Sequence, residues 1–245
     1  MQNYLIYISY NGKNYAGYQL QKNANTVGAE IKKALVFLFG EVYELHGCSR
    51  TDSGVHAKEF AVSFKAEKVM EESAVVRALN AKLPSDIAVG RCEYVPDSFH
   101  ARYSVKKKEY RYFIYTGKTR DPFLSDFSYS VGRPLDIEKM NKAAEYLVGK
   151  HDFTSFKAAG GKTEDCTRTI FSAQFEKKGD VVVFSVTGDG FLYKMVRLIV
   201  GTLIDVSDGK INTEDIPRIL SSKKQTPGFA APPQGLFLYR VYYED

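Results

Sequence analysis

A short segment near the start of the chain concentrates residues that can do chemistry. Residues 47–58 contain Arg50, Asp52, Gly54 and His56. A carboxylate can act as a nucleophile or stabilise a positive charge, and a nearby guanidinium can pair with anions. Glycine lets a ligand or another backbone segment approach closely. On residue types alone, the segment indicates either a catalytic loop or an Asx-turn in which the Asp52 side chain accepts a backbone amide.

Cysteine and histidine side chains in the same region allow a different chemistry. Cys48 is close in sequence to His46 and His56, so a Cys–His nucleophile is conceivable. Sequence spacing does not establish geometry, however, and small buried cysteines are common. The chain has three cysteines, Cys48, Cys92 and Cys166, without C-x-x-C spacing, so neither a zinc site nor a disulfide framework is indicated. We therefore expect no metal site.

The elements that must position this segment follow from hydrophobic periodicity. Residues 26–39 place Ile31 and Leu35 on one apolar stripe, which is typical of a helix packed on a sheet. Alternating β-branched and aromatic residues predict the strands. The first half is expected to have the order βαββαβ, with strands at 3–10, 41–45, 59–64 and 87–95 and helices at 26–39 and 72–83.

The second half repeats this order in its pattern. Strands are expected at 109–115, 169–176, 181–186 and 236–243, and helices at 137–148, 192–206 and 214–220. We therefore predict an α+β fold of two ferredoxin-like halves, 1–105 and 106–245, joined around the basic stretch 105–108. Their mixed and antiparallel sheets are expected to join around a central, positively charged cleft. Such a fold hosts many activities and names none of them.

Composition excludes few classes of function. The 245 residues are 44% hydrophobic and 26% charged, which is ordinary for a folded protein without disorder. The net charge of +5 is compatible with a polyanionic partner but does not identify one. The first residues lack a basic region followed by an apolar stretch, and no apolar run approaches membrane-spanning length. A cytoplasmic protein without a membrane partner is expected.

The order of several motifs resembles one known family. The segment from Arg50 to Ala57, Arg-Thr-Asp-Ser-Gly-Val-His-Ala, is similar to the signature of the TruA family of tRNA pseudouridine synthases. Three departures stand out, Ser49 for the usual Gly, Tyr18 for the usual Trp, and Tyr193-Lys194 where His-rich pairs are common. Further matches follow along essentially the whole chain, at Tyr10–Gly12, Asn14–Tyr15, Gly17–Gln19, Phe99–Arg102, Glu109–Tyr112, His151–Phe156, Arg168–Ile170, Phe191–Leu192, Met195–Arg197, and Gly235–Leu236 with Leu238.

The resemblance implies an enzyme that isomerises uridine to pseudouridine in the anticodon stem-loop of tRNA, at positions 38, 39 and 40. The C1′–N1 bond breaks, the uracil turns over, and C1′ rejoins through C5. No cofactor or metal is implied. A stacked uridine must be flipped out of the stem, at a cost that new stacking and phosphate contacts offset. The resemblance also implies a homodimer in which one tRNA bridges both subunits.

The resemblance implies roles for particular residues. Asp52 is the catalytic carboxylate, Arg197 its ion-pair partner, Tyr110 the residue that contacts the target base, Leu236 an apolar wall, and Arg50 a support for the flipped state. Each has a structural alternative, since strand Tyr and Leu residues usually pack in cores and helix Arg residues usually face solvent. RNA phosphates are candidate partners of the remaining set, His100, Arg102, Lys106, Lys107, Lys108, Lys157, Arg168 and Lys194.

Two other functions stay open on the sequence. A non-catalytic tRNA-binding protein or chaperone could keep the fold without the reaction. A carboxylate-dependent hydrolase would need a paired acid and base, and no second carboxylate near Asp52 has a motif behind it. Activity on an unmodified transcript separates the first alternative from the isomerase, and release of free uracil would support the second.

Overall fold

The computed structural model describes residues 1–161, 163–224 and 228–244 and has a mixed α+β fold. The chain forms two compact units. The first contains Met1–Lys106 together with the segment from Phe237 onward, and the second contains Lys107–Leu236. The sequence-based division at residue 106 places the last strand in the second half, whereas the structure groups it with the first unit. The reason is pairing, since Phe237 and Leu238 lie opposite His56 and Ala57 in a parallel ladder.

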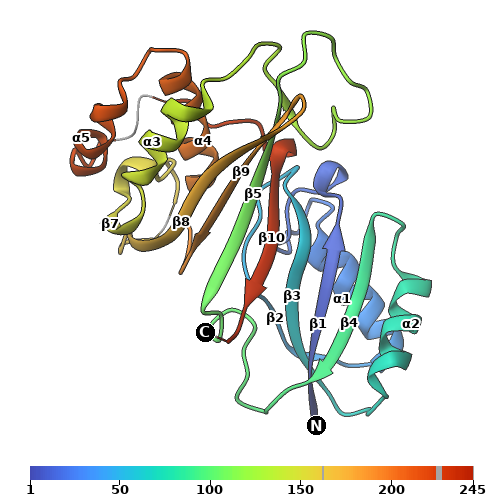
Figure 1. Cartoon of the computed structure of the whole chain (residues 1–245). Coiled ribbons are helices and arrows are strands. Elements are labelled where there is room, and N and C mark those ends of the chain that lie inside the picture. The colour runs from blue at the N-terminus through green and yellow to red at the C-terminus, as the bar shows by residue number, and fades with distance from the viewer. Residues whose placement is uncertain (162, 225–227, 245) are drawn as a thin grey trace. The chain divides into compact units, whose positions relative to one another are not determined.

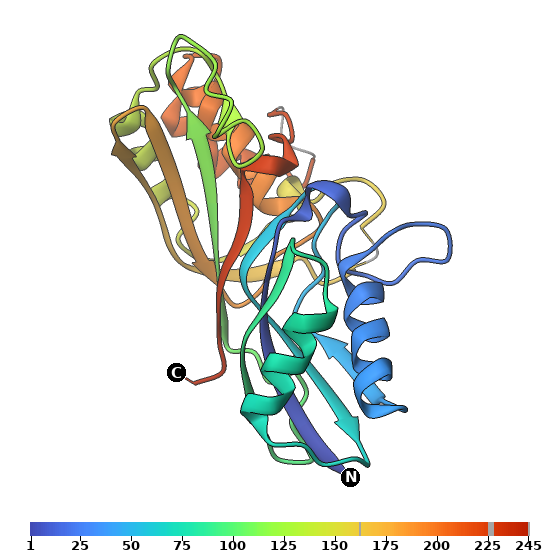
Figure 2. The same cartoon turned by 90° about the vertical axis from the view of Figure 1, so that its right-hand side faces the viewer.

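The first unit follows a β–α–β–β–α–β order and then receives the last strand of the chain. Both helices pack on the same side of its strands, as Figure 2 shows. The elements are β1 (Gln2–Tyr10), α1 (Val27–Phe39), β2 (Tyr43–Gly47), β3 (His56–Ala66), α2 (Glu72–Lys82), β4 (Ile87–Tyr94) and β10 (Leu236–Tyr242).

Strand β3 organises the sheet of the first unit. One edge of β3 pairs antiparallel with β1 along its length, and β1 pairs antiparallel with β4. The other edge of β3 is shared, because Val62 and Lys65 pair with β2 while His56 and Ala57 pair with β10. Tyr4 and Phe64, which are opposite each other in the β1–β3 ladder, are fully buried with stacked rings. The eight residues between β2 and β3 form a loop outside the sheet, and this loop leads into the start of β3, where β3 pairs with β10.

Local sequence signals account for the boundaries of α1. The Thr26 hydroxyl accepts from the Ala29 amide at 3.3 Å, which is the usual N-cap contact. The helix ends at Phe39 and is followed by Gly40, whose φ of +81° suits glycine. Ile31 and Leu35 are buried, as their spacing predicts.

The second unit adds elements to a β–α–β–β–α order. Its strands form an antiparallel sheet in the order β5-β9-β8-β7, and β6 pairs parallel with β5. Figure 1 shows α3, α4 and α5 gathered on one side of these strands. The elements are β5 (Lys107–Tyr115), β6 (Tyr129–Ser130), α3 (Ile137–Glu145), β7 (Gly149–Asp152), β8 (Thr167–Lys178), β9 (Val181–Gly188), α4 (Met195–Ser207) and α5 (Ile216–Ser221).

Some boundaries differ from those predicted. The helix expected from residue 192 begins at Met195, because Lys194 has a left-handed conformation with φ of +57°. The helix expected to reach residue 148 ends at Glu145, so that Gly149 can start β7. Strands β6 and β7 are too short, at two and four residues, to leave a periodic pattern in the sequence.

Candidate functional site

Asp52 starts a tight turn in the loop between β2 and β3. The Val55 amide donates to the Asp52 carbonyl oxygen at 3.2 Å, and Gly54 has a φ of +77°. A glycine with positive φ at the third position is characteristic of a type II turn. Asp52 is half-buried and Arg50 is exposed. The turn thus fixes the backbone of Asp52 and leaves its side chain within reach of solvent.

The segment that follows β1 holds this turn in place. The Tyr15 carbonyl oxygen accepts from the Gly54 amide at 3.2 Å and from the Ser53 hydroxyl at 3.3 Å. The Thr51 hydroxyl lies 2.9 Å from the Tyr10 hydroxyl in the interior. The motif near residue 12 and the motif near residue 52 are therefore hydrogen-bonded to each other and form one local structure.

Glycines let the two segments approach closely. A Cβ at Gly17 would lie 2.2 Å from the Thr51 carbonyl oxygen, and Gly17 also has a φ of +88°. A Cβ at Gly12 would lie 1.9 Å from the Val55 carbonyl oxygen. Real Cβ atoms do not come this near, so each position requires glycine unless the backbone shifts.

His56 supports the loop from inside the first unit. Its side chain is fully buried, its Nδ1 accepts from the Gly12 amide at 3.0 Å, and its ring stacks on Phe237 with 4.6 Å between centroids. An imidazole whose Nδ1 accepts a hydrogen bond is neutral and carries its proton on Nε2. His56 therefore links the Asp52 loop to the segment after β1 and to β10.

The Cys–His alternative receives no support from the environment of Cys48. Its side chain is fully buried, and its Sγ accepts from the Ala61 amide at 3.3 Å. Reactive cysteines are partly exposed and electropositive in their surroundings, whereas a buried thiol bonded to backbone behaves as a small core residue.

Tyr110 is in the second unit, on β5. Its burial is shared with Tyr112 and Ile114, which confirms that alternate residues of this strand face one side. Tyr110 is opposite Val186 of β9, and its ring meets that of Phe191 edge-on with 5.0 Å between centroids. The side chain of Phe191, in the segment after β9, thus packs against the base-contacting candidate.

Arg197 lies in the first turn of α4 and is 9% exposed. Its Nε donates to the Ala231 carbonyl oxygen at 2.6 Å, and the Ala231 amide donates to the Arg197 carbonyl oxygen at 3.0 Å. These two bonds hold Ala231 against the start of the helix. A helix N-terminus carries partial positive charge, which adds to that of the guanidinium. The position suits an anionic partner.

Tyr112 binds the same segment as Arg197, a contact that the alternating pattern of the strand does not predict. Its hydroxyl donates to the Pro232 carbonyl oxygen at 2.7 Å. Burial raises the pKa of Tyr112 above its usual value, while the nearby Arg197 guanidinium lowers it. Tyr112 and Arg197 therefore bind neighbouring carbonyl groups of one segment, a relation that no local sequence signal reveals.

Leu236 follows directly on this segment. It is 6% exposed and begins β10 after the turn Pro233–Gly235. A Cβ at Gly235 would lie 2.7 Å from the Tyr112 ring, so the chain passes close to that ring before it reaches Leu236. The structure thus brings Arg197 together with Tyr112 and residues 231–235. Arg50 and Asp52 belong to the first unit.

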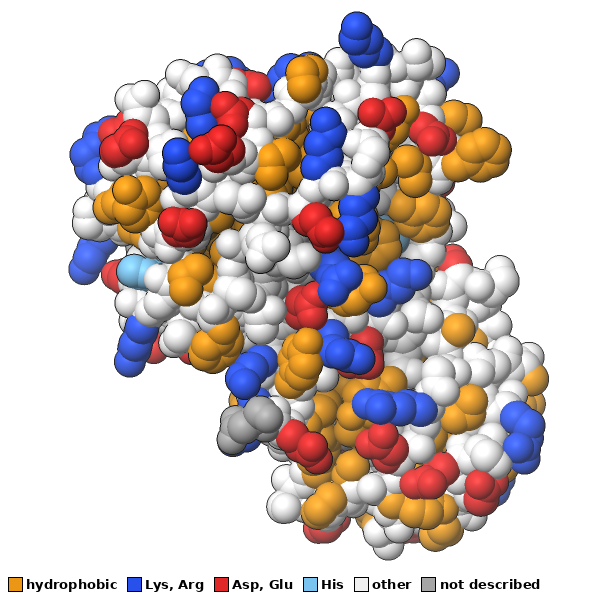
Figure 3. Space-filling model, in the orientation of Figure 1, with side chains coloured by type: hydrophobic (Ala, Val, Ile, Leu, Met, Phe, Trp, Pro, Cys, Tyr) orange, Lys and Arg blue, Asp and Glu red, His pale blue; other side chains and the backbone are white. Residues whose placement is uncertain are grey.

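The candidate RNA-binding residues differ in how they are held. Arg102 and Lys106 are exposed in the first unit. Lys157 and Arg168 of the second unit donate to backbone carbonyl oxygens of Thr163 and Asp165, each at 3.0 Å. The remaining candidate RNA-binding residues are half-buried, namely His100, Lys107, Lys108 and Lys194. Figure 3 shows acidic and basic side chains interspersed within each unit on the face drawn.

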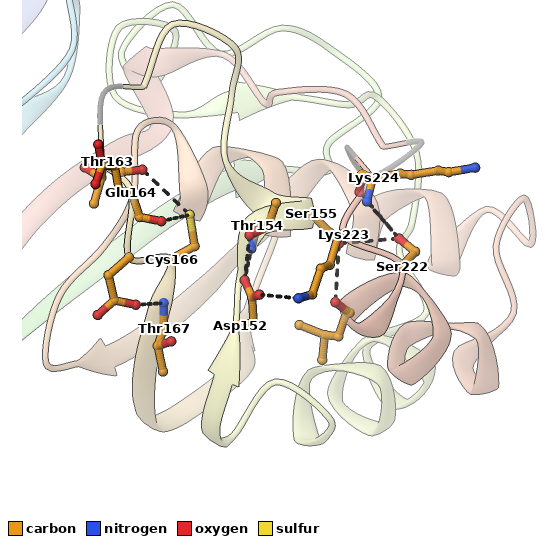
Figure 4. Close-up of polar contacts among 12 residues, drawn as sticks. Asp152, Thr154, Ser155, Thr163, Glu164, Cys166, Thr167, Ser222, Lys223 and Lys224 are labelled. Carbon is orange, nitrogen blue, oxygen red and sulfur yellow. Dashed lines mark hydrogen bonds and ion pairs between the residues drawn. The ribbon is translucent and has the colours of Figure 1, made fainter.

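The His151–Phe156 motif has a structural role in the second unit, shown in Figure 4. Asp152 accepts from the Thr154 amide at 2.9 Å and from its hydroxyl at 2.6 Å, which caps the short turn after β7. The Ser155 hydroxyl is buried and donates to the Ile219 carbonyl oxygen at 2.6 Å. The motif therefore ties β7 to α5.

Tyr18, one of the departures from the family pattern, is a core residue. It is 5% exposed, and its ring lies 4.2 Å from that of Phe60 between centroids. A Cβ at Gly47 would touch it. The change at this position therefore alters packing beneath the Asp52 loop and not a surface available to RNA.

The described residues also bear on metal binding and on membrane insertion. Within residues 1–161, 163–224 and 228–244, no group of three or more His, Cys, Asp or Glu side chains could hold a metal ion. In the same part of the chain, no helix is both long and apolar enough to cross a membrane.

Comparison with known proteins gives a consistent result. A family model described as tRNA pseudouridine synthase matches residues 6–104 and 143–244. A tRNA pseudouridine synthase A from Thermoanaerobacter sp. (strain X514) is 44% identical over 99% of this chain and 100% of the relative. The protein of that name from Exiguobacterium sp. is 42% identical over 100% of this chain and 99% of its own length. A solved Cbf5-Nop10-Gar1 complex has a chain with 12% identity and a TM-score of 0.38, covering 82% of this chain and 44% of that chain. That last likeness is too weak to carry an argument.

Proposed function

Because the chain belongs to the TruA family of tRNA pseudouridine synthases, we propose that it acts on the anticodon stem-loop and that Asp52 is its catalytic carboxylate. Membership makes the protein an isomerase that forms pseudouridine in tRNA. The finer proposal assigns the modified uridines to positions 38, 39 and 40. The catalytic assignment is supported most by the Asp52 turn, whose backbone is held by bonds within the turn and to Tyr15 while the Asp52 side chain stays half-buried.

Asp52 is proposed to act as a nucleophile towards the nucleoside. The carboxylate oxygen bonds to C1′ as the C1′–N1 bond breaks, and uracil leaves with the electron pair as an anion. The freed uracil turns within the site, and its C5 bonds to C1′ as the carboxylate leaves. The proton on C5 is then lost, and the N1 position of uracil gains one, so the product is an isomer. A rigid turn favours this chemistry because a fixed nucleophile spends less entropy on reaching its target. No cofactor is required.

Arg197 is proposed to keep Asp52 ionised when the target base excludes water from the site. Burial favours the neutral acid, whereas an adjacent guanidinium favours the carboxylate. The bond from Arg197 Nε to the Ala231 carbonyl oxygen supports this role, because it restricts the orientation of the guanidinium plane.

Tyr110 is proposed to contact the target uracil. Its ring can stack on the base while its hydroxyl forms a hydrogen bond or carries a proton. The contact with Phe191 supports the proposal, since it holds the ring in one orientation. Leu236 would supply an apolar wall.

Substrate binding is proposed to include base flipping, with Arg50 holding the flipped state. The basic set from His100 to Lys194 defined above would hold phosphates in a positively charged cleft.

We also propose that both units are ferredoxin-like, which the β4-β1-β3-β2 order of the first unit supports. A cytoplasmic homodimer completes the proposal, and a solution mass near the single-chain value of 27.6 kDa would contradict its dimeric part.

Asp52→Asn tests the catalytic assignment. The variant should bind tRNA with nearly unchanged affinity and lose pseudouridine formation, because an amide is a poor nucleophile but nearly isosteric with the acid. Tritium release from C5-labelled tRNA measures the reaction. The matched control is Asp180→Asn, an exposed aspartate in the turn between β8 and β9, which should keep full activity.

Appreciable tritium release by Asp52→Asn would sink the assignment. If the unaltered protein bound an unmodified transcript without releasing tritium, the non-catalytic alternative would replace the isomerase. Release of free uracil would favour the hydrolase.

A further inference from the structure

The turn after β4 is anchored on the sheet of the first unit. The His100 carbonyl oxygen accepts from the amides of Tyr103, at 3.1 Å, and Ser104, at 2.9 Å. Between them, the amide of the fully buried Ala101 donates to the Ser63 hydroxyl at 3.0 Å, and its carbonyl oxygen accepts from the Tyr243 hydroxyl at 2.8 Å. The turn is therefore held by β3 and by the end of the chain.

Three rings pack together where this turn meets β2. His46 and His100 have nearly parallel rings, 17° apart with 3.9 Å between centroids, and the Tyr103 ring lies 4.3 Å from that of His100. His100 Nδ1 accepts from the Arg102 amide at 3.1 Å, which fixes the orientation of the ring. Burial, His100 and Lys65 hold the pKa of His46 below its usual value, against the opposing charge of Glu44. A lowered pKa favours the neutral form of His46, which stacks on His100 without charge repulsion.

Tyr103 is the outer ring of the three, tilted by 40° to that of His100, and is 76% exposed. The Arg102 guanidinium lies 5.7 Å from the centre of its ring, within cation–π range. The ring is thus backed by His100, flanked by a positive charge and open to solvent. Proteins that bind unpaired nucleotides use this combination, because every base has an aromatic face and every nucleotide a phosphate.

We propose that Tyr103, backed by His100 and His46, is a stacking site for an unpaired base of tRNA, separate from the Asp52 loop. The inference rests on the proposed function, since it takes tRNA as the ligand. A stacking site differs from a phosphate contact in how its loss affects binding affinity. Loss of stacking weakens binding without changing how affinity depends on salt, whereas loss of a phosphate contact changes both.

The absence of tryptophan from the chain permits a direct test. In Tyr103→Trp, the new indole is the sole tryptophan, and a base stacked on it should quench its fluorescence as unmodified tRNA is titrated in. The matched control is Phe37→Trp on α1. Phe37 is 70% exposed and has the Lys82 ammonium 4.0 Å from its ring centre, so it presents a similar ring and charge elsewhere on the same unit. The control should not be quenched.

Affinity provides the second measurement. Tyr103→Ala should weaken tRNA binding about 10-fold, in line with the value of one base–aromatic stack, with an unchanged salt slope. Tyr103→Phe should restore it. Phe37→Ala should bind as the unaltered protein does.

The outcomes separate the inference from the function on which it rests. Saturated binding of tRNA without quenching of Tyr103→Trp, or equal quenching of the Phe37→Trp control, would overturn the stacking site while leaving the isomerase intact. So would a changed solution mass for Tyr103→Ala, which would assign the ring to contacts between copies of the chain. Failure of the unaltered protein to bind tRNA or form pseudouridine would instead contradict the proposed function.

Discussion

The backbone around Asp52 is held in place by hydrogen bonds to residues far from it in the chain. Thr51 bonds to Tyr10, and the turn after Asp52 bonds to the Tyr15 carbonyl oxygen. These contacts explain why an aspartate that could be an ordinary turn residue is held in one position. The same holds for Arg197, whose Nε bond to Ala231 orients a side chain that would otherwise be free to rotate about several bonds.

Arg197→Lys is expected to lower kcat for pseudouridine formation about 100-fold, because lysine lacks the planar fork and a misplaced group near the reacting atoms costs on that order. The bond from Nε to the Ala231 carbonyl oxygen is also lost. Tritium release measures the rate, and thermal unfolding shows whether the fold survives.

Arg218→Lys is the matched control. Arg218 is 77% exposed on α5 and pairs with Asp215 at 2.9 Å, so the same substitution there should leave kcat unchanged. A folded Arg197→Lys protein with normal kcat would refute the role proposed for the guanidinium.

At the scale of elements, the loop after β2 and the segment after β1 act as one unit of structure. Gly17 lies where the two approach most closely, with the Thr51 carbonyl oxygen in the space that a Cβ would occupy. The alternating burial of β5 and the capped start of α1 were predictable, because they depend on residues that are neighbours in sequence. The pairing of β10 with β3 was not, since it joins Phe237 to His56.

Gly17→Ala should lower both stability and activity. Its φ of +88° costs an alanine about 1–2 kcal/mol, and the new methyl group must displace the backbone beside Asp52. Gly40→Ala separates the two effects, because Gly40 has a similar φ of +81° with open space around it. Urea unfolding should show a loss in both variants. Pseudouridine formation should fall only for Gly17→Ala, and an equal fall in both would contradict the positional argument.

For the whole molecule, charge placement matters more than total charge. The net charge of +5 is small, and acidic residues are mixed with basic ones on the face drawn in Figure 3. Binding of a polyanion therefore depends on which basic side chains are exposed and not paired with carboxylates. Lys106 is exposed, between the turn of Tyr103 and β5.

Lys106→Ala should weaken tRNA binding and reduce by about 1 the slope of log affinity against log salt concentration, as expected for one lost phosphate contact. Lys142→Ala provides the comparison. Lys142 is 63% exposed on α3 and pairs with Glu138 at 3.2 Å, so its loss should leave the slope unchanged. Filter binding between roughly 50 and 200 mM salt measures both. Identical slopes for the two variants would remove Lys106 from the binding surface.

The amino-acid sequence was enough to identify the family, the Asp52 segment and most helices and strands, because motifs and periodicity are patterns among residues that are close together in the chain. Folding determined the rest. It turned Tyr18 into a core residue, grouped the last strand with the first unit, and made Tyr112 and Arg197 bind adjacent carbonyl groups. Each of these depends on contacts between residues far apart along the chain, whose partners are chosen by packing and pairing and leave no local pattern.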